Sequence, residues 1–116
     1  MGYDVHVTRN KYWIRSKFNP ISFEEWKNLV LHDTSMNLES NVDVKLGSGS
    51  EIFYAYGDGI AVWTPKVGKS EQQSVYFIYK DGRIVTKNPD RIAMQKLKEI
   101  AEKLQAYVIG DEGEEY

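Results

Sequence analysis

Residues 75–87 read VYFIYKDGRIVTK, and this stretch decides the fold. β-Branched and aromatic residues, which favour strands, run on both sides of Asp81 and Gly82. An Asp-Gly pair accepts positive φ at both turn positions and therefore predicts a two-residue hairpin loop. A loop of this length fixes the strand register, so we expect Tyr79 to face Ile84 on the drier side of the hairpin.

A capped amphipathic helix is predicted directly after this hairpin. Asn88 suits the N-cap, and Pro89 suits the first helical position, where its missing N–H would be unpaired in any case. Asp90 complements the positive end of the helix dipole. Apolar residues then recur at helical spacing and predict one buried stripe, formed by Ala93, Leu97, Ile100, Ala101 and Leu104.

The N-terminal part of the chain predicts a strand, an arm and a helix. Residues 3–9 alternate between apolar and polar, which is typical of a half-buried strand. Residues 10–20 have no clear period and predict a long loop or irregular arm. Ser22 and Glu25 form a capping box, which begins a helix that we expect to end near His32.

The remaining strands are expected after a polar stretch at residues 33–41. Residues 42–46 alternate and predict a short strand. Residues 52–56 and 60–64 flank a Gly-Asp-Gly sequence, which predicts a second hairpin between them. A last short strand is expected at 107–109, where Gly110 ends it.

This order of elements predicts an α+β fold. We expect an antiparallel sheet of about five to six strands with two helices on one face. A split β-α-β-like arrangement would make the first and last strands neighbours. A chain of 116 residues has room for one domain, which we place at residues 1–110. The acidic tail at 111–116 should fray unless something holds it.

Composition excludes several classes of protein. The chain is 41% hydrophobic and 28% charged, as soluble globular proteins are, and it has no cysteine for disulfides, thiol catalysis or thiolate metal sites. No apolar run approaches the ~18 residues of a membrane span, and the N-terminus lacks the layout of a signal peptide. We therefore expect a cytoplasmic protein without a membrane segment. The net charge of −2 argues against nucleic acid as a partner.

Asp4 and His6 are the candidate catalytic pair. They lie two apart on one predicted strand, so their side chains share a face, and a carboxylate can orient an imidazole for base catalysis. No nucleophile is identifiable beside them, and such pairs are more often the polar face of a strand. Two histidines without cysteine fall short of a zinc site, and the terminal carboxylates lack the spacing of a calcium loop. No metal or cofactor is expected.

Charges of opposite sign gather at the two ends of the chain. Basic and aromatic residues interleave in the N-terminal arm, where the candidate partner-binding residues are Arg9, Lys11, Trp13, Arg15 and Lys17. Carboxylates crowd the last residues, where the candidates are Asp111, Glu112, Glu114 and Glu115. The arm suits an acidic patch on a protein partner, and the tail suits a basic cleft.

Four segments spread along nearly the whole chain resemble a group of small uncharacterised bacterial proteins. These segments are GYDVHVTR at 2–9, ISFEEW at 21–26, IAVWT at 60–64 and GDEGEEY at 110–116. No activity, cofactor or catalytic residue is assigned to that group, so the resemblance implies only a stand-alone bacterial domain. Small acidic bacterial domains of this kind are often immunity proteins that neutralise a cognate toxin, which is an analogy of class.

We therefore expect a non-catalytic protein-binding domain of the immunity-like kind, whose partner is a protein such as a cognate toxin. Two alternatives stay open. One is a small enzyme that uses Asp4 and His6. The other is a weak binder of single-stranded RNA, which would stack bases on sheet aromatics, especially Tyr54, Tyr56, Trp63, Tyr76 and Tyr79. The sequence leaves the oligomeric state unknown.

Overall fold

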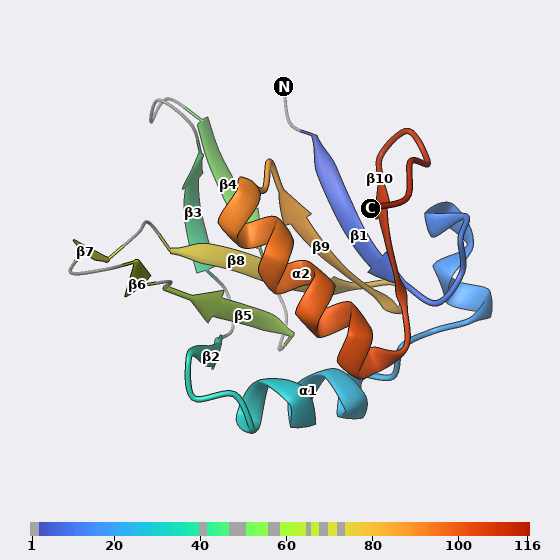
Figure 1. The fold of residues 1–116 in the computed structure, drawn as a ribbon, viewed down its shortest axis with the longest axis horizontal. Coiled ribbons are helices and arrows are strands. Elements are labelled where there is room, and N and C mark those ends of the chain that lie inside the picture. Colours follow the sequence, from blue (N-terminus) through green and yellow to red (C-terminus); the bar gives the residue numbers. More distant parts are fainter. Residues whose placement is uncertain are drawn as a thin grey trace.

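A six-stranded antiparallel sheet forms the centre of the computed structural model, which describes residues 3–39, 42–46, 51–55, 59–64, 66–67, 70–71 and 74–116. Its strands are β1 (Asp4–Thr8), β2 (Met36–Glu39), β5 (Ile60–Trp63), β8 (Val75–Lys80), β9 (Arg83–Lys87) and β10 (Tyr107–Gly110). Their order across the sheet is β10-β1-β9-β8-β5-β2, as Figure 1 shows. Two smaller sheets pair β3 (Val42–Leu46) with β4 (Glu51–Ala55), and β6 (Lys66–Val67) with β7 (Ser70–Glu71).

The helices are the 3-10 helix η1 (Trp13–Phe18) and the α-helices α1 (Phe23–Leu31) and α2 (Arg91–Leu104). Strand β1 pairs antiparallel with both β9 and β10, so β9 and β10 run parallel to each other. Because α2 connects them across β1, these elements form a split β-α-β unit. The predicted α+β class and the predicted pairing of the first and last strands are both confirmed.

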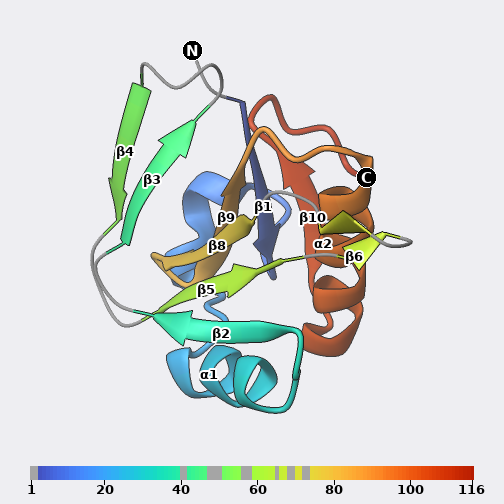
Figure 2. The same ribbon diagram turned by 90° about the vertical axis from the view of Figure 1, so that its left-hand side faces the viewer.

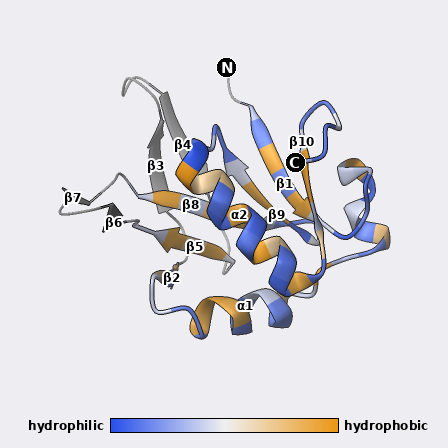
Figure 3. Cartoon of the chain, in the orientation of Figure 1, coloured by the Kyte–Doolittle hydropathy of each residue, from blue (hydrophilic) through white to orange (hydrophobic). Residues whose placement is uncertain are grey.

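Both α-helices cover the same face of the sheet. Trp26 of α1 is fully buried and donates its indole N–H to the carbonyl oxygen of Gly59 at 2.9 Å. The predicted stripe of α2 is buried along its whole length and packs against Val5 and Val7 of β1. Most of the other residues of α2 are hydrophilic, as Figure 3 shows. Figure 2 shows α2 and the β3-β4 pair on opposite sides of the sheet.

The β8-β9 hairpin has the predicted register. Tyr79 pairs with Ile84, and the two turn residues, Asp81 and Gly82, have φ values of 51° and 78°. A Cβ atom added at Gly82 would lie 2.7 Å from the Cβ of Pro20. Glycine is therefore required here both by the backbone angle and by the close approach of the N-terminal arm.

The start of α2 differs from the prediction. Asp90, not Asn88, is the N-cap, and its carboxylate accepts the backbone N–H of Ala93 at 2.8 Å. Asn88 instead has a φ of 46°, and its side-chain oxygen accepts the backbone N–H of Tyr3 at 2.9 Å. Because Asp90 caps the helix, Asn88 lies in the loop before α2, and its side chain binds the residue that precedes β1.

The predicted hairpin between residues 52–56 and 60–64 is wrong. Strand β4 pairs with β3, whereas β5 lies inside the large sheet between β2 and β8. Gly59 lies close against Tyr79. Its carbonyl accepts the backbone N–H of Tyr79 at 3.0 Å, and an added Cβ would lie 2.5 Å from the Cβ of Tyr79. The other residues of the predicted turn, 57 and 58, lie outside the described residues.

Helix α1 begins with the predicted capping box and ends at the C-cap His32. The polar stretch that follows contains β2, which the sequence did not predict. Asp33 at the start of this stretch forms an ion pair of 2.6 Å with Lys96 of α2, and both side chains are largely buried. Burial alone would raise the pKa of Asp33, but hydrogen bonds with Lys96 and Ser35 outweigh it and lower the pKa to about 2. This pair ties α2 to the connection between α1 and β2.

In the described ranges, no helix combines the length and the apolar character that crossing a membrane requires.

Candidate functional site

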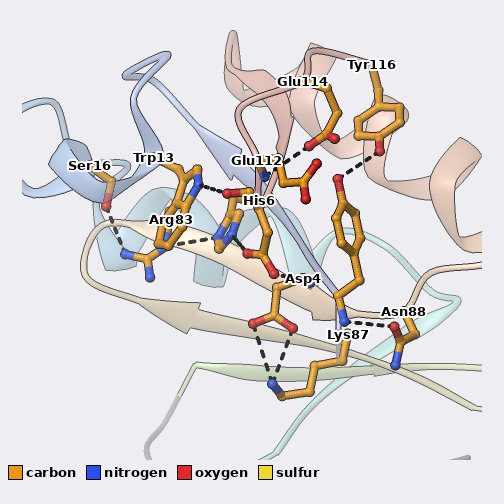
Figure 4. A network of polar contacts seen from close by, with 12 residues as sticks. Asp4, His6, Trp13, Ser16, Arg83, Lys87, Asn88, Glu112, Glu114 and Tyr116 are labelled. Atoms are coloured by element: carbon orange, nitrogen blue, oxygen red, sulfur yellow. Dashed lines mark hydrogen bonds and ion pairs between the residues drawn. The ribbon is translucent and has the colours of Figure 1, made fainter. Parts of the chain in front are cut away.

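A buried imidazole lies at the centre of a polar cluster on the face of the sheet that α1 and α2 do not cover (Figure 4). Side chains alternate along β1, so His6 points away from the core that Val5 and Val7 enter. The ring of His6 is 2% exposed. Its Nε2 lies 2.9 Å from Oδ1 of Asp111, and Nε of Arg83 donates to its Nδ1 at 3.1 Å.

These two contacts define the protonation state of His6. A guanidinium N–H can only donate, so Nδ1 accepts from Arg83 and the ring proton sits on Nε2, which donates to Asp111. Burial lowers the pKa of His6, and the charge of Arg83 lowers it further, whereas the contact with Asp111 acts in the opposite direction. The net pKa lies below the usual value, so the imidazole is neutral at pH 7.

Trp13 of η1 covers one face of this imidazole. The two rings stack with centroids 4.1 Å apart and an interplanar angle of 6°, and the Arg83 guanidinium lies 5.1 Å from the Trp13 ring. The indole N–H donates to the backbone carbonyl of Asp111 at 3.2 Å. Trp13 therefore joins the N-terminal arm to the C-terminal segment through the cluster.

Ser16 provides the second attachment of η1. Its hydroxyl donates to the backbone carbonyl of Asp81 at 2.6 Å and accepts from Nη1 of Arg83 at 3.2 Å. Ser16 is fully buried, which is unusual for a serine in a surface segment and is explained by these two bonds. The arm at 10–20 was expected to be irregular, but it contains a 3-10 helix attached at Trp13 and Ser16.

The C-terminal residues fold back along β10. The backbone N–H of Gly110 donates to the carbonyl of Glu114 at 2.8 Å, and that of Tyr116 donates to the carbonyl of Val108 at 2.9 Å. The hydroxyls of Tyr3 and Tyr116 lie 3.2 Å apart. The tail was expected to fray unless something holds it, and these contacts hold it in place.

Asp4 and His6 share a face of β1 as predicted, but they do not form the predicted pair. Asp4 binds Lys87 at 3.2 Å, and the carboxylate on the imidazole belongs to Asp111, 105 residues away in the sequence. Sequence reasoning placed Asp111 in the tail and missed Arg83 as a partner. The predicted pairing of first and last strands was the available signal, because extending that register beyond Gly110 brings Asp111 beside β1.

The cluster leaves no position on His6 for a substrate. Protein groups occupy both ring nitrogens, Trp13 covers one face, and the ring is almost entirely inaccessible. A general base must reach the proton that it removes, which this ring cannot do without opening the cluster. Across the described ranges, no three His, Asp or Glu side chains gather at a spacing that could hold a metal ion.

Two of the sheet aromatics considered for RNA, Tyr79 and Trp63, are not part of an open platform. Tyr79 lies under α1, where its ring contacts Phe23 and its hydroxyl donates to the carbonyl of Ile21 at 2.8 Å. Trp63 packs against Phe77 of the core. Both belong to the face that the helices cover. The side chains of residues 54 and 56 lie outside the described part of the structure.

Some basic residues of the arm bind groups within the chain, and others are exposed to solvent. Arg9 forms a bidentate ion pair with Glu25 and also donates to the carbonyl of Leu104. Lys11 lies 3.8 Å from Glu115. Lys17 is 72% exposed and lies 3.8 Å from Asp81, at the outer limit of an ion pair. Arg15 is also exposed, and within the described residues no carboxylate lies at ion-pair distance from it.

The acidic candidates divide in the same way. The carboxylate of Asp111 binds His6. The carboxylate of Glu114 accepts the backbone N–H of Glu112 at 3.2 Å and so holds the start of the tail. Glu112 and Glu115 remain exposed. Figure 1 shows η1, in blue, and the C-terminal segment, in red, at the same end of the sheet. The two charged ends of the sequence therefore lie side by side.

Three large apolar side chains stand out on the outer side of the arm. Tyr12, Ile14 and Phe18 are 75%, 76% and 79% exposed. Other exposed apolar residues of the described chain are less exposed, and two of them, Tyr107 and Tyr116, lie in β10 and the tail. Surface apolar residues are common singly, but a group of three on one short segment is typical of an interaction site.

No protein-family model matches the chain, and comparisons with curated proteins and with solved structures find no significant match.

Proposed function

We propose that this chain is a non-catalytic protein-binding domain of the immunity-like kind, which binds its partner through the outer side of η1. The observation that carries the proposal is the exposure of Tyr12, Ile14 and Phe18 on a segment whose inner side is fastened to the cluster. Aromatic side chains with an adjacent arginine are the residue types that contribute most to binding at protein interfaces.

The attachment of η1 supports this proposal on energetic grounds. Binding costs free energy when loops and side chains must first be ordered, and a segment that is already ordered avoids much of that cost. Trp13 and Ser16 fix the backbone of η1 through a ring stack and two hydrogen bonds. The arm can therefore present its apolar side chains without prior rearrangement.

The immunity-like assignment rests on the resemblance to small bacterial proteins and on the state of the imidazole. Binding of a toxin needs an exposed surface and no reaction centre. The one buried histidine of the described chain is saturated by Asp111, Arg83 and Trp13. In this proposal the domain acts in the cytoplasm, where it would meet a toxin before that toxin causes damage.

The test is rescue of growth in the bacterium that encodes the chain. The product of the neighbouring reading frame is expressed with the wild-type chain, with Ile14→Ser/Phe18→Ser, or with Leu31→Ser. Leu31 is 62% exposed on α1 and serves as a matched control for loss of an exposed apolar side chain. We expect rescue by the wild type and by Leu31→Ser, and none by the double variant.

A neighbour that is not toxic, or that is neutralised equally by all three chains, would contradict the proposal. Urea unfolding of each purified variant checks that loss of rescue is not loss of folding. The substituted side chains make few contacts within the fold, so changes within about 0.5 kcal/mol are expected.

A further inference from the structure

The outer side of η1 carries two kinds of side chain. Trp13 and Ser16 are attached to the cluster. The helix is kinked at Arg15, whose φ of −99° and ψ of 21° are not helical. Apolar and basic side chains are exposed together on this segment, and they are Tyr12, Ile14 and Phe18 with Arg15 and Lys17.

Two basic side chains, Arg15 and Lys17, lie among the apolar residues of this surface. Arg15 and Lys17 are exposed, and Asp81 lies 3.8 Å from Lys17, where its attraction is weak in water. Asp81 is also shared with Arg83, whose Nη1 lies 3.7 Å from it. The surface around Arg15 and Lys17 therefore carries an excess of positive charge.

Basic and acidic side chains lie together at the residues just before η1. Lys11 lies 3.8 Å from Glu115 and 5.4 Å from the ring centre of Tyr107. Because the tail is held on β10, its carboxylates stay at this end and do not reach across to balance Arg15. A partner thus meets a surface on which the exposed apolar side chains of Tyr12, Ile14 and Phe18 are interspersed with the basic side chains of Arg15 and Lys17.

We propose that the partner offers η1 an apolar depression bordered by Asp or Glu side chains, which lie opposite Arg15 and Lys17. This inference rests on the proposed function and adds the chemistry of the partner. Apolar side chains in the middle of an interface contribute most of the affinity, and charges at its rim set the association rate and the specificity.

Selection from a phage-displayed random-peptide library against the whole chain tests this inference. Selection is carried out at low salt, and the enriched peptides are sequenced and synthesised. We expect them to combine large apolar residues with Asp or Glu. Their affinity for the wild type should fall steeply as salt is added, because the rim charges are exposed to solvent.

A pair of charge-reversal variants gives the sharper measurement. Arg15→Glu/Lys17→Glu is compared with Arg91→Glu/Lys98→Glu, which makes the same change of charge at exposed positions of α2. We expect the arm variant to weaken peptide binding by at least about tenfold and the α2 variant to leave it nearly unchanged. Peptides in which Lys replaces Asp and Glu should regain affinity for the arm variant.

The outcomes separate this inference from the proposed function. Enriched peptides without acidic residues, or acidic peptides that bind both variants equally, would overturn the acidic border. If those peptides still fail to bind Ile14→Ser/Phe18→Ser, the arm remains the binding surface. Peptides that bind this serine variant as well as the wild type would overturn both. Tighter binding to phosphatidylglycerol vesicles than to any peptide would also overturn both, since it assigns the arm to a membrane surface.

Discussion

His6 is a neutral imidazole held between an anion and a cation. Asp111 accepts its Nε2 proton, and Arg83 donates to its Nδ1. Neither neighbour alone explains the burial of the ring, because a polar group buried without partners costs stability. Together they satisfy both nitrogens. In the described residues no buried side-chain nitrogen or oxygen is left without a hydrogen bond.

This arrangement predicts a dependence of stability on pH. Burial and the charge of Arg83 lower the pKa of His6 in the folded chain below the ordinary 6.5. Between those two pKa values the unfolded chain binds the additional proton. The stability contributed by His6 is therefore present above pH 6.5 and is lost as the pH falls toward the folded-state pKa. The slope for one proton is at most about 1.4 kcal/mol per pH unit.

Urea unfolding at about pH 7.5 and about pH 5.5 measures this dependence. His6→Gln should lose it, whereas His32→Gln should keep it, since His32 is exposed at the end of α1. Equal slopes in the wild type and His6→Gln would show that the imidazole is not the group responsible. The window lies above the range in which ordinary carboxyl groups titrate, so their contribution stays small.

Local spacing predicted part of this cluster and could not predict the rest. It placed Asp4 and His6 on one face because alternation along a strand is a property of neighbouring residues. It gave no information on Asp111 or Arg83, since both reach His6 only through strand pairing. The mixture of a tryptophan, a serine and basic residues in the arm was also ambiguous, because only the fold decides which of them face inward.

At the scale of elements, the contact between the arm and the β8-β9 turn connects η1 to the sheet. The backbone N–H of Ile21 donates to the carbonyl of Gly82 at 2.9 Å, and Pro20 lies against the turn. The turn thus serves two purposes. It sets the register of the hairpin, and its outer surface supports the end of the arm.

Two glycines with positive φ allow the steric part of this contact to be measured. Gly82 has a φ of 78° and lies against Pro20, whereas Gly113 has a φ of 88° and has open space where a Cβ would point. Gly113→Ala should cost only the backbone strain, about 1 kcal/mol. Gly82→Ala adds the clash with Pro20 and should cost about 3 kcal/mol. Equal costs in urea unfolding would show that the arm moves away from the turn without penalty.

Elements with a strong local signal were predicted, and those that depend on distant partners were not. The Asp-Gly turn, the capping box of α1 and the stripe of α2 each depend on residues close in sequence. Strand β2 was missed because its residues lie in a polar stretch, and pairing with β5 makes it a strand. The Gly-Asp-Gly sequence predicted a turn, but Gly59 is required by the approach of Tyr79.

For the whole molecule, the C-terminal segment belongs to the fold. It provides the acceptor for His6, the carbonyl for Trp13 and two backbone hydrogen bonds that run along β10. Carboxylates at residues 111–115 on their own predict a solvated tail. Here the tail closes the cluster that fastens the arm.

Truncation after Gly110 tests how much the fold depends on this segment. Removal of residues 111–116 leaves the buried His6 and the half-buried Trp13 without acceptors, and each buried group without a partner costs about 1 to 3 kcal/mol. We expect a loss of at least about 2 kcal/mol in urea unfolding at neutral pH. Glu112→Gln/Glu115→Gln removes two exposed charges but keeps these bonds, so it should unfold like the wild type. A truncated chain with wild-type stability would contradict the structural role of the segment.

The insertion of β1 between β9 and β10 also determines when the domain can form during synthesis. Strand β1 pairs on both sides with strands that come much later in the sequence, so both of its edges stay unpaired until residues 83–110 have been translated. The cluster that fastens η1, which follows β1 directly, also needs Asp111 and therefore forms equally late.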